Sequence, residues 1–463
     1  MVEQTRYRLD DGRELLCQET VRLLPGKRQV CMGTLDGRPV FAKLYLDPKR
    51  GKVHWQRELA GIQAFQQGGI LTAELLYAGE LADSGWPVIV LARIPEPLSL
   101  MDAWEQEDDA SREQLLRRLV SVLARHHKAG LLQTDLHLGN FVLSGGDIYS
   151  LDGAGVTAIG RELGPDVSLE NLALLIAQLY PEWESQVPVL YAGYLAERGW
   201  KKGPGREDLG RRVRRQRKGR WREFQGKLFR ECTDFVCRKQ PGRLEMVVRE
   251  VLSPALERVL ADPDATFPGV DQALKNGNTC TVWVAEAGDQ RLVIKRYNVK
   301  NIWHGIKLSS RQGRAFVSWE NAHRLRFYGI ATPRPIALLK ERRGPLQPVA
   351  YFIMEQVEGV GAQEWFKDSA VPWEQKQQMA DRIGRLLGQL KDQRISHGDM
   401  KASNILLVAG EPMLIDLDAM CQHGGAGAFR KAWAGDMQRF LRNWEDMPEL
   451  KELFTQALQG QLD

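Results

Sequence analysis

Aspartate and asparagine recur at one spacing in two distant parts of the sequence. Asp135 precedes Asn140 by five residues in LLQTDLHLGNFVL, and Asp399 precedes Asn404 by the same step in RISHGDMKASNILLV. A carboxylate in a loop can accept the proton of a hydroxyl group, and an amide oxygen is a ligand that suits Mg²⁺. The pattern therefore predicts phosphoryl transfer, with Asp135 and Asp399 as the catalytic groups.

A second aspartate follows on an apolar run in each part. Asp152 lies in IYSLDGAG and Asp416 in MLIDLDAM, each 17 residues after the first aspartate. Asp418 is an alternative to Asp416, but the spacing and the apolar lead-in favour Asp416. We expect Asp152 and Asp416, together with Asn140 and Asn404, to bind the metal.

Two lysines and two glutamates lie upstream in the same order. Lys43 and Lys295 are central in the alternating runs RPVFAKLYL and RLVIKRYNV, which predict strands. Glu58 and Glu320 lie in the helix-like segments that follow. A strand lysine can bind the α- and β-phosphates of a nucleotide, and a helix glutamate can orient that lysine.

These two sets of residues indicate that one large structural unit occurs twice in the chain. The residue types and their order resemble the protein-kinase-like superfamily. The sequence DLHLGN at 135–140 is similar to the loop of aminoglycoside and choline kinases. The sequence HGDMKASN at 397–404 looks closer to the bacterial lipopolysaccharide core kinases that act on heptose and Kdo. The likeness covers roughly 20–235 and 265–445.

The resemblance implies an α+β fold with two tandem protein-kinase-like bilobal domains, at 1–240 and 241–463. Each domain would have a small antiparallel N-lobe sheet and a helical C-lobe, with ATP and Mg²⁺ between them. We place Lys401 with the cofactor-binding residues, although Lys401 and His137, two residues past their aspartates, could instead support the loop. Gln133 and Thr134 stand where many relatives have His-Gly or His-Arg before the aspartate.

Phosphate-binding and substrate signals of protein kinases are weak here. No GxGxxG motif occurs, and the turns at 24–27 and 275–279 are the alternatives for a phosphate loop. No activation segment ends in Ala-Pro-Glu, which argues against a protein substrate.

Composition favours a soluble intracellular protein. The chain has 463 residues, 43% of them hydrophobic, with a net charge of +5. Its six cysteines show no CxxC spacing, so we expect them to be reduced. We expect no secretory signal, because the N-terminus is charged from its third residue and has no apolar segment, and no apolar run is long enough to cross a membrane.

A basic run at 211–222, RRVRRQRKGRWR, exceeds what a solvated helix face needs. It predicts contact with an anionic membrane surface or an acidic glycolipid, and no specific nucleic acid is expected because no nucleic-acid-binding motif accompanies it.

The function expected from these observations is an ATP-dependent kinase of sugar hydroxyls. The acceptor is the lipopolysaccharide inner core, with heptose favoured, at the cytoplasmic face of the inner membrane. Two alternatives stay open: one active unit with a pseudokinase or scaffold unit, and a kinase of another small molecule or of a protein.

Overall fold

The computed structural model describes residues 4–201, 203, 205–298, 313–342 and 348–461. The chain folds as two compact units, Met1–Lys218 and Gly219–Asp463. The division falls inside helix α6 (Arg206–Lys227), upstream of the boundary at residue 240 that the sequence predicts. Residues after the division pack with the second unit because Trp221, Leu228 and Phe235 lie in its core.

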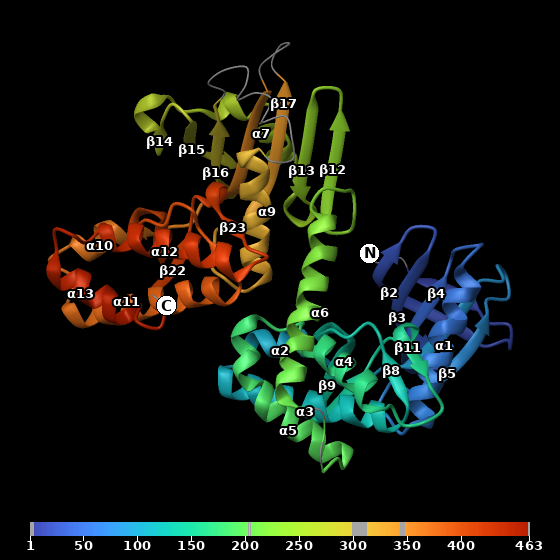
Figure 1. Ribbon diagram of the computed structural model, residues 1–463. Helices are drawn as coiled ribbons and strands as arrows, with labels where there is room; N and C mark the ends of the chain where they lie inside the picture. Colours follow the sequence, from blue (N-terminus) through green and yellow to red (C-terminus); the bar gives the residue numbers. More distant parts are fainter. Residues whose placement is uncertain (1–3, 202, 204, 299–312, 343–347, 462–463) are drawn as a thin grey trace. The chain divides into compact units, whose positions relative to one another are not determined.

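The first unit begins with a six-stranded antiparallel sheet in the order β1-β2-β3-β4-β6-β5 (Figure 1). Every second residue of β4 is buried, which gives the sheet an apolar face. The elements of this part are β1 (Thr5–Arg8), β2 (Glu14–Leu24), β3 (Arg28–Leu35), β4 (Arg38–Tyr45), α1 (Gly51–Gln67), β5 (Leu75–Glu80) and β6 (Pro87–Ala92).

The rest of the first unit is mainly helical, and its core gathers buried residues of α3, α4 and α5. Short strands and 3₁₀ helices connect these helices. The elements are β7 (Leu98–Ser99), α2 (Leu100–Gln106), α3 (Asp109–Lys128), β8 (Leu131–Gln133), η1 (Leu138–Asn140), β9 (Phe141–Ser144), β10 (Asp147–Ser150), η2 (Gly153–Gly155), β11 (Val156–Ala158), α4 (Pro165–Ile176), η3 (Pro181–Gln186) and α5 (Val187–Arg198).

The second unit repeats this plan with a seven-stranded antiparallel sheet. Its order is β12-β13-β17-β18-β16-β15-β14, so the series β5-β6-β4-β3 of the first unit recurs as β17-β18-β16-β15. The elements are β12 (Phe235–Gln240), β13 (Arg243–Val248), η4 (Arg249–Val251), α7 (Pro254–Ala261), η5 (Pro263–Thr266), η6 (Val270–Gln272), β14 (Lys275–Asn276), β15 (Cys280–Ala287), β16 (Gln290–Tyr297), α9 (Arg314–Phe327), β17 (Pro335–Arg342) and β18 (Pro348–Glu355).

A helical part completes the second unit (Figure 1). One large cluster of buried side chains joins α9, α11, α12 and α13, so the sheet-bound helix and the helical part share a core. The elements are β19 (Val360–Gly361), α10 (Ala362–Lys367), α11 (Trp373–Asp392), β20 (Ile395–Ser396), η7 (Ala402–Asn404), β21 (Ile405–Val408), β22 (Glu411–Leu414), η8 (Leu417–Ala419), β23 (Cys421–Gln422), α12 (Ala426–Arg442) and α13 (Pro448–Ala457).

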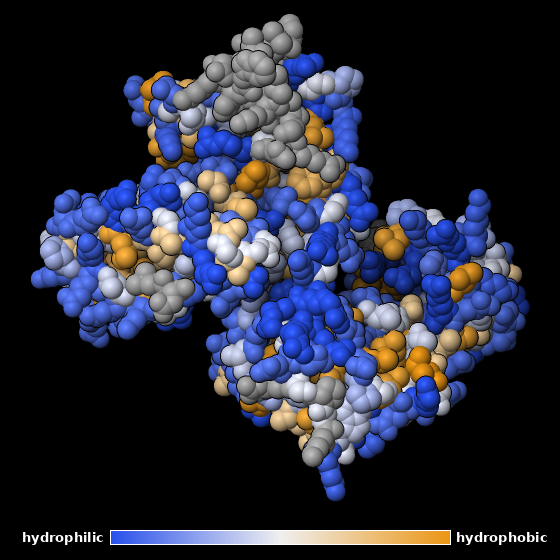
Figure 2. Space-filling model, in the orientation of Figure 1, coloured by the Kyte–Doolittle hydropathy of each residue, from blue (hydrophilic) through white to orange (hydrophobic). Residues whose placement is uncertain are grey.

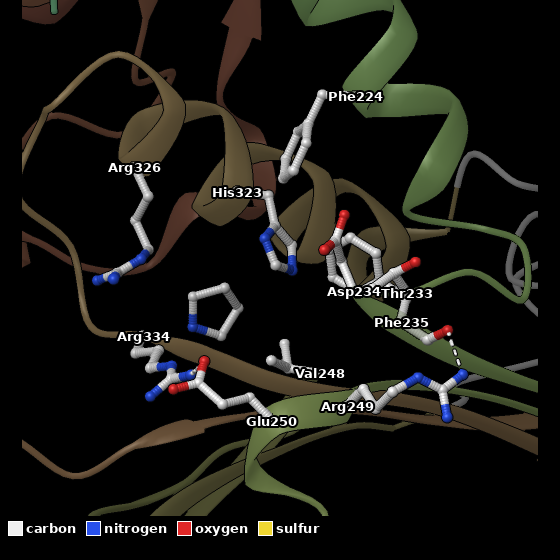
Figure 3. A pocket seen from close by; sticks show the side chains of 11 residues that line it. Phe224, Thr233, Asp234, Phe235, Val248, Arg249, Glu250, His323, Arg326 and Arg334 are labelled. Atoms are coloured by element: carbon white, nitrogen blue, oxygen red, sulfur yellow. Dashed lines mark hydrogen bonds and ion pairs between the residues drawn. The ribbon is translucent and has the colours of Figure 1, made fainter. Parts of the chain in front are cut away.

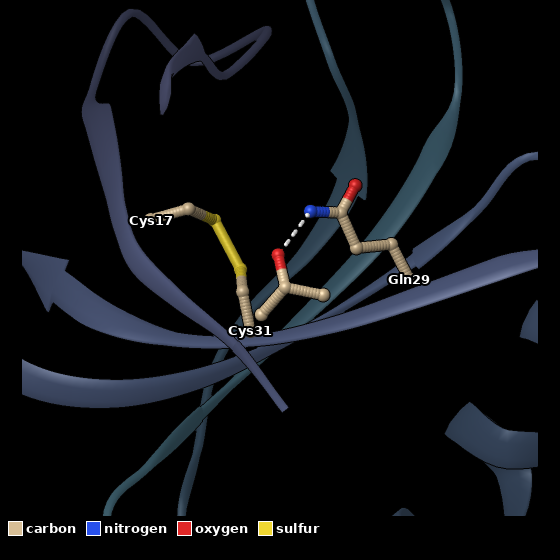
Figure 4. The surroundings of a disulfide bond; sticks show 4 residues. Cys17, Gln29 and Cys31 are labelled. Carbon is tan, nitrogen blue, oxygen red and sulfur yellow. Dashed lines mark hydrogen bonds between the residues drawn. A yellow bond between two sulfur atoms is a disulfide. The ribbon is translucent and has the colours of Figure 1, made fainter. Parts of the chain in front are cut away.

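The predicted mixture of antiparallel sheets and helices is confirmed. The expectation that every cysteine is reduced is wrong for one pair, because Cys17 of β2 and Cys31 of β3 form a disulfide (Figure 4). Beside it, Gln29 donates a hydrogen bond to Thr20 across the same two strands. The sequence could not reveal this pair, because only the strand register brings the two thiols together.

Surface polarity agrees with the composition. In the face shown in Figure 2, hydrophilic residues predominate and apolar residues form small separate groups. Among the described residues, every helix is too short or too polar to serve as a membrane span.

Candidate functional site

Helix α12 supports the loop that carries Asp399 through hydrogen bonds. The backbone N–H groups of His397 and Gly398 donate to Oδ2 of Asp436, at 2.7 and 3.1 Å, and Asp436 is 1% exposed. Gly398 has a φ of +79°, and a Cβ there would lie 2.4 Å from the carbonyl oxygen of Ala419. A glycine is therefore required at this position, and Asp436 is a positioning residue for Asp399.

Asn404 links this loop to the next strand pair. Its Nδ2 donates to the carbonyl oxygen of Asp399 at 2.8 Å, and its own carbonyl accepts from the N–H of Ile415 at 3.0 Å. Asp416 follows with a left-handed φ of 61°. Asp399, Asn404 and Asp416 are therefore connected through a short backbone network.

Lys295 reaches this network from β16. Its Nζ donates to Asp416 and, at 2.7 Å, to Asp418, which also accepts from Arg314 at 2.8 Å. Burial disfavours the charged lysine, but Tyr297, Asp418 and Asp416 outweigh burial and raise the pKa of Lys295. Burial likewise opposes ionisation of Asp416, but the charge of Lys295 prevails and its pKa is lowered.

The predicted ion pair between Glu320 and Lys295 is not formed. Glu320 accepts hydrogen bonds from Arg324 and, at 2.8 Å, from Gln225. Ser318, not Glu320, lines the small cavity beside Lys295. The reason is helical register: aligning the Gly-Ile pair that follows each helix would have placed Ser318 at the position of the first unit's glutamate.

The first unit repeats the loop geometry. Nδ2 of Asn140 donates to the carbonyl oxygen of Asp135 at 2.8 Å, and the N–H of Leu151 donates to the carbonyl of Asn140 at 2.8 Å. Asp152 has a left-handed φ of 51°, and its side chain accepts from the N–H of Ala154. The sequence spacing thus corresponds to the same hydrogen-bonded loop in both units.

Lys43 and Glu58 form a direct ion pair in the first unit. Nζ of Lys43 lies 2.5 Å from Oε1 of Glu58, and this oxygen also accepts from the N–H of Gly153 at 3.2 Å. Burial raises the pKa of Glu58, although Lys43 opposes the shift. Burial also opposes ionisation of Asp152, but Lys43 lowers its pKa. The structure therefore brings Lys43, Glu58 and Asp152 together.

The missing histidine before Asp135 is replaced by other contacts. Thr134 donates to the carbonyl of Gly155 from both its N–H and its hydroxyl, at 2.8 and 3.1 Å. Nδ2 of Asn171 donates to the carbonyl of Gln133 at 2.7 Å, and its Oδ1 bonds the buried His127. These contacts hold the first unit's loop without histidine at position 133.

Lys401 and His137 both face the aspartate two residues before them. Lys401 donates to Asp399 at 2.9 Å, whereas Nε2 of His137 lies 3.7 Å from Asp135. Arg439 of α12 approaches Asp399 to 4.0 Å. The second unit's aspartate is therefore flanked by two cations.

Sequence reasoning missed Asp436 and Arg439, yet the sequence carries a signal for Asp436. This acid lies on the buried stripe of α12, in helical step with Phe429 and Trp433. An acid on an apolar helix face predicts a polar partner in the core.

The residues present fit a magnesium ion. In each unit the amide nitrogen of the asparagine is used within the loop, at Asn404 and at Asn140, so the side-chain oxygen is the atom that could serve as a ligand together with Asp416 or Asp152. Mg²⁺ in nucleotide sites takes one or two protein oxygens and completes its shell with phosphates and water. The described residues hold no cluster of three or more His, Cys, Asp or Glu side chains suited to a metal held by protein alone.

The basic run at 211–222 is largely neutralised by acids of its own unit. Arg212 bonds Asp166, Asp208 and Glu170, and Arg217, 4% exposed, pairs with Glu184. Three further arginines also pair with these acids: Arg211, Arg214 and Arg215. Much of the run therefore attaches α6 to the first unit.

Comparison with known proteins points to the second unit. Residues 272–457 match the model of the lipopolysaccharide kinase (Kdo/WaaP) family. A 3-deoxy-D-manno-octulosonic acid kinase of Xylella fastidiosa strain 9a5c is 28% identical over 167 residues, which cover 33% of this chain and 63% of that protein. The kinase of the same name from strain M23 is 28% identical over 161 residues, covering 31% and 59%.

The match thus spans less than two thirds of these relatives. The match to the family model, over residues 272–457, includes the loops of Asp399 and Asp416 and the strand of Lys295. Residues 272–457 of this chain are therefore similar to the lipopolysaccharide kinase (Kdo/WaaP) family.

Proposed function

We propose that the second unit transfers the γ-phosphoryl group of ATP to a hydroxyl of a sugar in the lipopolysaccharide inner core. The observation that carries the proposal is the network joining Asp399, Asn404, Asp416 and Lys295. The relatives are named for 3-deoxy-D-manno-octulosonic acid, and the loop at 397–404 resembles that of the kinases that act on heptose and Kdo. The acceptor is accordingly one of these inner-core sugars.

Each residue has a role in this proposal. Asp399 orients the acceptor hydroxyl and accepts its proton, and Lys295 binds the α- and β-phosphates. Asn404 and Asp416 supply oxygen ligands to Mg²⁺, whose chemistry there is to neutralise phosphate charge. Because Lys295 is bonded to Asp416 and Asp418, it exchanges one of these partners for phosphate when nucleotide binds.

We further propose that the first unit is a second kinase-like domain. Its Lys43, Glu58, Asn140 and Asp152 would bind the nucleotide and metal, with Asp135 at the hydroxyl. The repeated sheet order and loop hydrogen bonds support this reading. The alternative, a pseudokinase or scaffold unit, is favoured by the replacement of histidine by Gln133 and by the single flanking His137 at Asp135.

A lipid-linked acceptor places the protein at the cytoplasmic face of the inner membrane. The basic run at 211–222 contributes to this contact only through side chains not already paired, among which Lys218 and Arg222 are exposed. Positive side chains near an anionic surface add about 1 kcal/mol each, so this contact is weak and depends on salt.

The experiment is phosphate transfer from ATP to purified core oligosaccharide, followed by the mass increase of one phosphate group. Asp399→Asn should lower turnover on the order of 10²–10⁴-fold, the usual effect of losing a general base. Asp446→Asn, at an exposed acid on the same unit, is the matched control.

Asp135→Asn and the double variant then separate the units. Equal partial losses indicate two active sites, whereas an unaffected Asp135→Asn assigns the first unit a scaffold role. Full activity of Asp399→Asn, or absence of any nucleotide-dependent transfer by the unaltered protein, contradicts the proposed function.

A further inference from the structure

A cavity of about 400 Å³ opens in the second unit away from Lys295. Phe224 of α6, Phe235 of β12, His323 of α9 and Arg334 before β17 contribute to its wall. It shares no lining residue with the cavity beside Lys295. A volume of this size falls within the range of small-molecule sites.

A buried polar group without a partner faces this cavity. Figure 3 shows His323 pointing from α9 into the space, with Phe224 above it and Asp234 and Phe235 to one side. The residue is 7% exposed, and its Nε2 makes no hydrogen bond. Burial lowers the pKa of His323 to about 3, so the ring is neutral at physiological pH. Buried polar atoms are usually hydrogen-bonded, and an exception at a cavity marks a place for a ligand atom.

Guanidinium groups border the same cavity. Figure 3 places Arg326 and Arg334 on one side of the opening. Arg334 donates to Glu250 at 2.6 Å, whereas the exposed guanidinium of Arg326 makes no side-chain hydrogen bond or ion pair within the described residues. Arg249, on the other side, is fixed by the carbonyl groups of Cys232 and Phe235. Of these three arginines, Arg326 is therefore the one whose guanidinium is available to a ligand.

We propose that this cavity binds a sugar-sized organic anion. Arg326, supported by Arg334, takes a carboxylate or phosphate group, because the guanidinium fork matches both. Phe224 and Phe235 contact the body of the ligand, and Nε2 of His323 bonds one of its hydroxyl groups. Binding here needs no phosphoryl transfer, so the site is independent of the proposed function.

The location gives the site a means of acting on the loop of Asp416. Asn321, on the same helix as His323, donates from Nδ2 to the carbonyl oxygens of Leu417 and Met420, at 3.1 and 2.9 Å. A ligand held by α9 therefore contacts the helix that supports this loop.

The test is ligand-observed saturation-transfer NMR on the full chain. Glucose 6-phosphate and gluconate are the two anionic probes, one with a phosphate and one with a carboxylate. Inorganic phosphate, which lacks the sugar, and glucose, which lacks the charge, are the control ligands. Arg326→Gln should weaken binding of the anionic sugars at least tenfold. Arg385→Gln removes an equally exposed arginine from α11 and should leave binding unchanged.

His323→Phe keeps an aromatic ring in the core and removes the unpaired nitrogen, so the fold should persist while binding weakens. Melting curves of each variant verify folding. Binding by only one of the two anionic sugars supports the proposal and identifies the charged group. Three outcomes overturn it: neither sugar binds, glucose or inorganic phosphate binds as tightly, or Arg326→Gln and His323→Phe bind like the unaltered chain.

Discussion

Lys43 of β4 and Glu58 of α1 form an ion pair whose nitrogen and oxygen lie 2.5 Å apart, with the carboxylate 1% exposed. In the second unit the corresponding lysine, Lys295, pairs with Asp416 and Asp418 instead. The two units therefore hold the same lysine position with carboxylates from different elements. A buried carboxylate is tolerated only while its partner is present.

Removing the partner should destabilise the first unit. Lys43→Met leaves Glu58 as an uncompensated buried charge and should lower the unfolding free energy by about 3–5 kcal/mol. The double variant Lys43→Met/Glu58→Gln should regain most of this loss, because glutamine is neutral and still accepts from Gly153. Scanning calorimetry of the first unit's transition measures both. Equal stability of the single and double variants would contradict the ion-pair role.

The same variant has a distinctive pH dependence. Burial raises the pKa of Glu58 in the folded state, and loss of Lys43 removes the opposing charge. Above the unfolded pKa of about 4.3 the folded state then binds more protons than the unfolded state. The free energy of unfolding of Lys43→Met must therefore fall as pH rises from the unfolded pKa of Glu58 to its higher pKa in the folded state. A flat or rising profile would exclude this explanation.

The close approach of α1 to the loop of Asp152 depends on a glycine. A Cβ on Gly61 would lie 1.9 Å from the carbonyl oxygen of Gly153. Gly61→Ala should therefore displace this loop, destabilise the first unit and abolish the Mg²⁺-dependent nucleotide binding that we propose for it. Gly193→Ala on α5 is the control, because nothing lies within 4 Å of its Cβ. It should be neutral or stabilising by about 0.5–1 kcal/mol. Similar effects of both would refute the steric argument.

Replacing Asp416 and replacing Asp418 should have different effects on Mg²⁺-dependent nucleotide binding. The side chain of Asp418 is 6% exposed and is shared by Lys295 and Arg314, whereas that of Asp416 is 26% exposed. Asp416→Asn should therefore weaken Mg²⁺-dependent binding of an ATP analogue at least tenfold, and Asp418→Asn should preserve the dependence on Mg²⁺. Titration calorimetry in an Asp152→Asn background isolates the second unit. The reverse ranking would make Asp418 the metal ligand.

His127 should make the first unit sensitive to acid. Its ring bonds Tyr194 at 2.7 Å and Asn171 at 2.9 Å, and burial lowers its pKa to about 4. Between pH 6.5 and about 4 the unfolded state binds a proton that the folded state does not. Stability must therefore fall as pH decreases through this window, by up to about 1.4 kcal/mol per pH unit.

His127→Gln should reduce that slope, part of which remains because burial also lowers the pKa of His126 to about 3, and the exposed His54→Gln should leave it unchanged. Calorimetric melting temperatures between pH 4 and 7 check both. An unchanged slope in His127→Gln would show that other groups cause the acid sensitivity.

Much of the candidate site could be predicted because its signals are local in sequence. The five-residue step from Asp399 to Asn404 spans one loop, and the apolar run after it dictates a strand that returns Asp416 to the same place. Period-two alternation around Lys295 likewise indicated its strand. Such patterns record backbone geometry over a few residues, and they determine which groups can meet.

Partners between distant elements were decided only by the tertiary structure. Glu320 points to Arg324 and Gln225 because of the rotation of α9, Asp436 reaches the loop of Asp399 from α12, and Cys17 meets Cys31 through strand register. The sequence by itself determined the repeated loops and the strands that carry their lysines. Which acid each cation contacts depends on how helices and strands pack, because a shift of two residues along a helix turns a side chain away from its expected partner.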